Sequence, residues 1–75
     1  MVTITDEPRS LGEALPKEMA RVRDEVMPAY HAIGSAGAFA LSMMRRDLDL
    51  AAKAMAEGDA VAMLRVYESL RGYST

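Results

Sequence analysis

The chain has 75 residues, no cysteine, nine lysines plus arginines and eleven acidic residues, which give a net charge of -2. This length allows one small domain, and the absence of cysteine excludes a disulfide scaffold, a zinc ribbon and a thiol nucleophile. The acidic balance disfavours a general polyanion binder, and no apolar run approaches the ~18 residues that a membrane span requires. We therefore expect a small, soluble, cytoplasmic protein.

The composition predicts an all-α fold. Hydrophobic residues make up 51% of the chain, yet there are seven methionines, one phenylalanine and no tryptophan. Methionine and the abundant alanine favour helices, whereas strands favour β-branched and aromatic residues. A core below ~70–80 residues seldom supplies more than a few kcal/mol, so small chains often need a disulfide, a metal or self-association. Since the sequence indicates neither a disulfide nor a metal site, we expect a homodimer that forms a helical bundle.

Residues 1–14 are polar and are interrupted by Pro8 and Gly12. We interpret them as a flexible arm, with a short turn at residues 10–13, where Ser10 and Glu13 have capping-box spacing. The single helical domain then covers residues 15–72, and residues 73–75 form a frayed tail.

The first helix is predicted over residues 16–33, because proline is favoured at the first helical position and Pro16 stands there. Pro28 lacks a backbone donor, so it should kink or break this helix near residues 24–27, and the sequence leaves both possibilities open. One apolar stripe follows the helix at steps of three and four, through Leu15, Met19, Val22, Val26, Tyr30 and Ile33.

The second helix is predicted over residues 36–57, after a corner at residues 34–37, and the third over residues 59–71. Gly58 should end the second helix and Asp59 should cap the third, which makes a tight antiparallel hairpin. Charges of alternating sign at four-residue spacing mark the solvent face of the second helix: Arg45, Asp49, Lys53 and Glu57. The apolar arc on its other side is wider than one helix contact needs, which indicates partners on more than one side.

Asp47 is the anomaly of this arc, because a buried carboxylate needs a hydrogen-bond partner or water. Either Tyr67, Tyr30 or an arginine satisfies it, or the arc is partly exposed there, or Asp47 belongs to a polar partner-binding site. The methionines of the arc are interpreted mainly as core, while Met27 lies off the first stripe and is a candidate contact residue. The predicted interaction residues are Phe39, Met43, Met44, Asp47, Leu48 and Met27.

No catalytic, cofactor-binding or metal-binding residues are predicted, and we expect no enzyme. His31 is the one histidine, which cannot make a site of three or four ligands or a catalytic triad without companions, so we interpret it as a surface residue. The leading hypothesis is a non-enzymatic helical module that binds itself or another protein. The alternative is a small nucleic-acid-binding regulator, which would use Arg21, Arg23, Arg45 and Arg46, although each lies among acidic residues.

Two segments of the sequence resemble known groups of proteins. Residues 54–59, with the sequence Ala-Met-Ala-Glu-Gly-Asp, followed by Leu64 and Tyr67, resemble one tetratricopeptide helical hairpin over residues 48–70, which implies a hairpin and, in a single copy, no peptide-binding solenoid. Across residues 15–73, this string and Gly-Ala-Phe-Ala at residues 37–40 are similar to short all-α proteins of proteobacteria and their phages or mobile elements. This second resemblance is to uncharacterised proteins and implies no activity; for a phage-type interaction module, an adaptor or inhibitor that acts on a host protein is a natural form.

Overall fold

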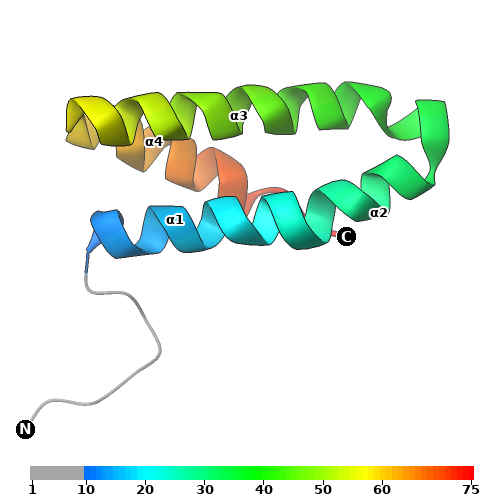
Figure 1. The fold of residues 1–75 in the computed structure, drawn as a ribbon, viewed down its shortest axis with the longest axis horizontal. Coiled ribbons are helices and arrows are strands. Elements are labelled where there is room, and N and C mark those ends of the chain that lie inside the picture. The colour runs from blue at the N-terminus through cyan, green and yellow to red at the C-terminus, as the bar shows by residue number, and fades with distance from the viewer. Residues whose placement is uncertain (1–9) are drawn as a thin grey trace, which may run out of the picture.

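The structure, a computed structural model, describes residues 10–75. The predictions for residues 1–9, which include most of the arm, lie outside the described residues. Within the described part the chain is all-α, with no residue in a strand. Three helical segments pack together, in agreement with the three helices predicted along the sequence (Figure 1).

The first segment consists of α1 (Leu11–Arg21), the π-helical turn η1 (Val22–Val26) and α2 (Met27–Ala32). A short 3-10 turn, η2 (Gly34–Gly37), leads into α3 (Ala38–Glu57), and α4 (Ala60–Arg71) follows. The second and third helices therefore begin and end within two residues of their predicted limits.

The first helix begins five residues earlier than predicted, at Leu11. Ser10 is its N-cap, and the Ser10 hydroxyl accepts a hydrogen bond from the Glu13 amide at 3.3 Å. The capping-box spacing therefore marks a helix start, and the prediction that Pro16 occupies the first helical position is wrong. Pro16 lies inside α1, where it withholds one backbone donor from the ladder.

Replacing Ser10 with alanine is expected to lower the free energy of unfolding by about 1 kcal/mol, because the Glu13 amide loses its side-chain acceptor and keeps only the Ser10 carbonyl at 3.1 Å. Denaturant titration of the variant beside the unchanged protein measures this loss. A Ser10→Asp variant retains an acceptor and should stay close to the original stability; a similar loss in both variants would contradict the cap.

Pro28 does not break the first helix. The π-helical turn immediately before it lets the Met27 amide donate to the Val22 carbonyl, five residues back. A proline in an α-helix leaves the carbonyl four residues earlier without its donor and crowds it, and a wider turn relieves that conflict. The chain therefore continues as helix through α2, which leads up to the corner with α3 (Figure 1).

The core lies where the three segments meet. Its buried side chains are Leu15, Val22, Val26, Leu41, Met44, Ala51, Val66 and Leu70. Most of the predicted first-helix stripe is thus buried or partly buried, but Ile33 is 57% exposed. The physical reason is visible in Figure 1, since α4 ends partway along the molecule and does not extend to the corner that follows α2.

The hairpin between α3 and α4 forms as predicted. Gly58 ends α3 in the left-handed conformation with φ 66°, and Asp59 accepts a hydrogen bond from the Ala62 amide at 3.1 Å. Glycine adopts this φ without the Cβ penalty, and the aspartate satisfies an otherwise free amide at the start of α4. None of the helices among residues 10–75 is long and apolar enough to cross a membrane.

Candidate functional site

The predicted interaction residues do not form one surface. Phe39 is 78% exposed and Met43 is 38% exposed, whereas Met44 is completely buried. Leu48 and Met27 are half-buried and pack against the core. Successive helical residues point about 100° apart, so the broad arc of the sequence is divided between an inner side of α3 and an outer one.

A groove runs between α3 and α4 and is lined by apolar and charged residues of these two helices and the turn that joins them. Its volume is about 580 Å³. Two of its apolar residues are well exposed, Leu50 at 44% and Val61 at 62%. Its apolar lining is Leu50, Ala54, Val61, Ala62 and Val66. We call this lining, together with Met43 on the same side of α3, the outer face.

Asp47 lies at the floor of this groove and is 9% exposed. Its Oδ2 accepts two hydrogen bonds, from the Ser69 hydroxyl at 2.7 Å and from the Tyr73 hydroxyl at 2.8 Å. Two hydroxyl donors compensate for much of the lost hydration of the carboxylate. The expectation that Asp47 is satisfied within the fold is confirmed, but Tyr67, Tyr30 and arginine were the wrong partners.

The partners of Asp47 could not be identified from periodicity. Tyr73 lies beyond the last turn of α4, in the segment predicted as a frayed tail. Its amide donates to the Leu70 carbonyl at 3.1 Å, and its side chain is partly buried against the core. The next residue is also held, because the Tyr30 hydroxyl donates to the Ser74 carbonyl at 3.1 Å. These contacts join residues far apart in sequence, which no local pattern encodes.

The Tyr73 hydroxyl has a raised pKa of about 12, first because burial disfavours the phenolate and then because the hydroxyl donates to the charged Asp47. The protonated form is therefore favoured in the folded state. The stability that this provides is complete below pH 10.0, the ordinary value, and is lost as the pH rises towards about 12.

Comparison of the protein with its Tyr73→Phe variant isolates this effect. The free energy of unfolding of the two proteins should differ most below pH 10, and the difference should shrink between pH 10 and about 12. Urea titrations across this range measure it, and the variant shares every other ionisable side chain with the original protein. A difference that stays constant over the whole range would contradict the contact.

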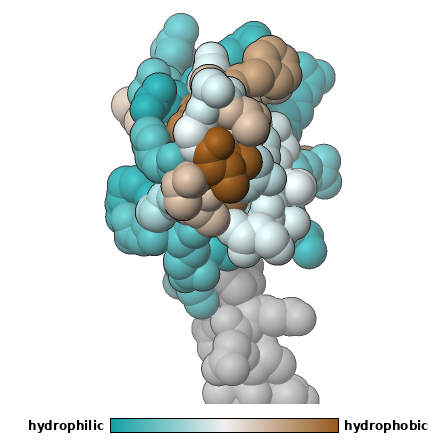
Figure 2. Space-filling model, turned by 90° about the vertical axis from the view of Figure 1, so that its right-hand side faces the viewer, coloured by the Kyte–Doolittle hydropathy of each residue, from teal (hydrophilic) through white to brown (hydrophobic). Residues whose placement is uncertain are grey.

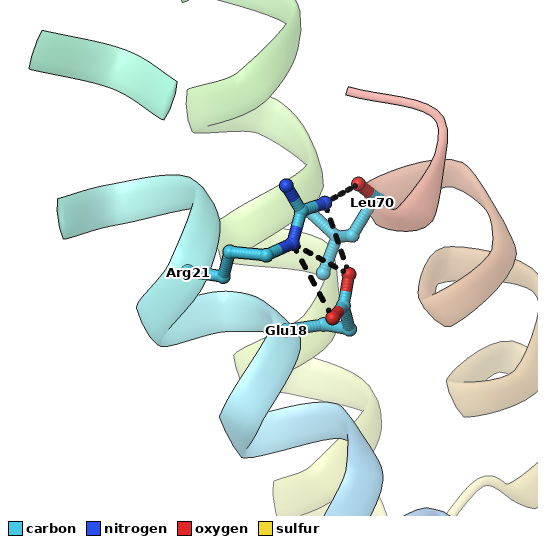
Figure 3. A network of polar contacts seen from close by, with 3 residues as sticks. All are labelled: Glu18, Arg21 and Leu70. Carbon is cyan, nitrogen blue, oxygen red and sulfur yellow. Dashed lines mark hydrogen bonds and ion pairs between the residues drawn. The ribbon is translucent and has the colours of Figure 1, made fainter. Parts of the chain in front are cut away.

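A second polar network fastens α1 to the end of α4 (Figure 3). Arg21 donates from Nε and Nη2 to the Glu18 carboxylate, and Nη2 also donates to the Leu70 carbonyl at 3.0 Å. The last carbonyls of a helix lack partners within it, so a cationic donor there is favourable. Arg21 therefore has a structural role.

Arg23 binds the neighbouring Asp24 at 2.8 Å, which lowers the pKa of that exposed carboxyl and raises the pKa of the guanidinium. Arg45 and Arg46 are exposed on α3. Two of the four arginines of the nucleic-acid hypothesis thus already contact carboxylates.

The four alternating charges of α3 are exposed, as predicted. They are Arg45, Asp49, Lys53 and Glu57. Within residues 10–75, however, the ion pairs are Arg21 with Glu18 and Arg23 with Asp24, and none joins members of this α3 row.

The end of the molecule where α2 meets α3 carries a separate hydrophobic patch surrounded by polar surface (Figure 2). Ile33 and Phe39 are the large exposed apolar residues of this corner. Phe39 thus lies at the far end of α3 from the groove.

His31 is exposed, as predicted, and the part of the chain that the structure describes contains no group of three or more side chains suited to a metal ion. No family model, curated protein or solved structure matches this chain.

Proposed function

We propose that this protein is a small non-enzymatic interaction module that self-associates through its outer face. The observation that supports this most is the partly apolar groove between α3 and α4, which α1 does not line. Burial of apolar surface is the main driving force of association, and Leu50 and Val61 keep about half of their surface available for it.

The charges around the groove favour a second copy of the chain as the occupant. Lys53 and Arg65 are balanced by Glu57 and Asp59, all four of which line the groove. A polyanion or an anionic membrane would be complemented by a basic rim, whereas a balanced rim fits another balanced rim. Self-association also adds buried core to a chain that has no disulfide to stabilise it.

The nucleic-acid alternative gains less support. Arg21 and Arg23 contact Glu18 and Asp24, so half of its proposed cations are neutralised locally. Alternatively, the protein is a phage-type adaptor whose outer face binds a host protein. A protein that is monomeric in solution would favour this alternative.

Light scattering over a concentration series tests the proposal. We expect a mass of twice 8.2 kDa that persists on dilution. Leu50→Glu should weaken the dimer at least tenfold, because it places a charge on the apolar lining.

Leu64→Glu is the matched control, since Leu64 lies on α4, is 49% exposed and does not line the groove. It should leave the dimer unchanged. A monomer at every concentration would overturn the proposal, as would equal effects of the two substitutions.

A further inference from the structure

We propose that the corner between α2 and α3 docks on the surface of a bilayer that contains anionic lipids. This corner plays no part in the proposed self-association, so neither proposal depends on the other. Phe39 is a predicted interaction residue that does not belong to the outer face. Together with Ile33 and the turn η2, it forms what we call the tip of the molecule, where α2 meets α3 (Figure 1).

The tip carries two large apolar side chains that project into solvent. Ile33 is 57% exposed and Phe39 is 78% exposed, and hydrophobic surface is visible at this end of the molecule (Figure 2). Two projecting side chains supply little of the area that a stable protein interface buries. A bilayer closes around a small apolar projection without needing a complementary shape, and aromatic and aliphatic side chains insert well at its interface.

The charges nearest the tip are positive. Residues 26–46 contain no aspartate or glutamate, although the whole chain has a net charge of -2. Arg45 and Arg46 are both exposed on α3. The next carboxylate, Asp47, accepts two hydrogen bonds within the fold, and Glu25 lies more than two turns before the tip. This end therefore complements an anionic surface and disfavours a second copy of itself, which would bring like charges together.

Arg46 lies on the same side of α3 as Phe39. Seven residues separate them, which is almost two full turns, so the two side chains project about 20° apart around the helix and about 10 Å apart along it. When the Phe39 ring reaches the boundary between headgroups and acyl chains, the Arg46 guanidinium lies at the level of the lipid phosphates. An apolar anchor beside a cation is a combination that holds proteins reversibly on anionic membranes.

Sedimentation with lipid vesicles tests the proposal. We expect the protein to bind vesicles of equal parts phosphatidylcholine and phosphatidylglycerol at least tenfold more strongly than vesicles of phosphatidylcholine alone. Each arginine near an anionic surface contributes about fivefold, and the acidic remainder of the chain opposes part of this gain. The preference should fade as salt is added, because salt screens the attraction.

Two substitutions with matched controls locate the contact. Phe39→Ser should weaken binding to the mixed vesicles at least fivefold, whereas Leu64→Ser, at a 49% exposed site on α4, should leave it unchanged. Arg46→Gln should lose about fivefold on the mixed vesicles and nothing on the neutral ones. Lys17→Gln removes the same charge from an exposed site on α1, which begins at the opposite end of the molecule, and should have a much smaller effect (Figure 1).

A fluorescent label reports which end of the molecule meets the lipid, because the chain has no native cysteine. Ser35 is exposed in η2, so Ser35→Cys places an environment-sensitive fluorophore at the tip while Ile33 and Phe39 remain. Its emission should shift to the blue on the mixed vesicles and be quenched by spin-labelled lipids. The same fluorophore at Leu64→Cys should not respond.

The membrane contact and the self-association fail separately. Absence of vesicle binding overturns the membrane contact and leaves the tip to a protein partner. Binding that Phe39→Ser leaves unchanged, or equal responses of the two labels, also overturns docking through the tip. A protein that binds vesicles through the tip but stays monomeric at every concentration overturns the self-association alone.

Discussion

Gly37→Ala is expected to lower the free energy of unfolding by about 3 kcal/mol. A Cβ at this position would lie 2.3 Å from the Tyr30 carbonyl oxygen and 3.1 Å from an Ile33 side-chain carbon. The first of these atoms belongs to the backbone at the end of α2, so the corner between α2 and α3 must open to relieve the clash. For a chain of this size, such a loss corresponds to a fall in Tm of about 12–24 °C.

Gly12→Ala is the matched control. A Cβ there meets nothing closer than the Ser10 hydroxyl at 3.7 Å, and the residue lies in the first turn of α1. Alanine loses less backbone entropy than glycine in a helix, so this variant should be as stable as the original or slightly more stable. Thermal unfolding of both variants followed by circular dichroism measures the contrast, and a Gly37→Ala protein with unchanged Tm would contradict the close approach.

Met44→Ala is expected to cost about 2–5 kcal/mol of stability. Met44 is completely buried and belongs to the core cluster of the three segments. Truncation removes a large apolar side chain from a small core and leaves a cavity that the neighbouring helices fill only in part.

The adjacent Met43 provides an internal control of the same chemistry. It is 38% exposed on the outer side of α3, so Met43→Ala should cost less than about 1 kcal/mol in monomer stability. Urea titration at several low protein concentrations separates this cost from any effect on dimerisation. A larger loss for Met43→Ala than for Met44→Ala would show that α3 is rotated from the orientation described.

The end of a helix can be predicted from the sequence where a capping side chain or a glycine acts only on the backbone groups next to it. Gly58 and Asp59 specify the hairpin because a left-handed residue and an N-cap need nothing from the rest of the fold. Ser10 belongs to the same class, because its spacing to Glu13 indicates a cap, although the preference of proline for the first helical position favours a start at Pro16. Proline is tolerated further inside a helix once the packing of Leu15 and the rest of the core supports it.

Pro28 shows a different limit of prediction from the sequence. The missing donor is evident from the sequence, and the disturbance lies where it was expected. Whether the chain responds by breaking or by widening one turn depends on the packing of residues on both sides of it. Val22 and Val26 are both buried in the core cluster, which holds the helix together through the π-helical turn.

The candidate site was the least predictable part. Periodicity alone could not divide the broad arc of α3 into the buried Met44 and the exposed Phe39 and Met43, because that division depends on where α1 and α4 lie. Asp47 was recognisable as a carboxylate in need of donors. Its donors, Ser69 and Tyr73, come from another helix and from the segment after it.

The sequence by itself therefore determined the fold class, the hairpin and the charged row of α3, since composition, caps and four-residue spacing act within one helix or one turn. Only the tertiary structure decided which side of α3 is covered, what satisfies Asp47, and that a partly apolar groove remains open between α3 and α4. These features depend on contacts between distant parts of the chain, which helical periodicity does not specify.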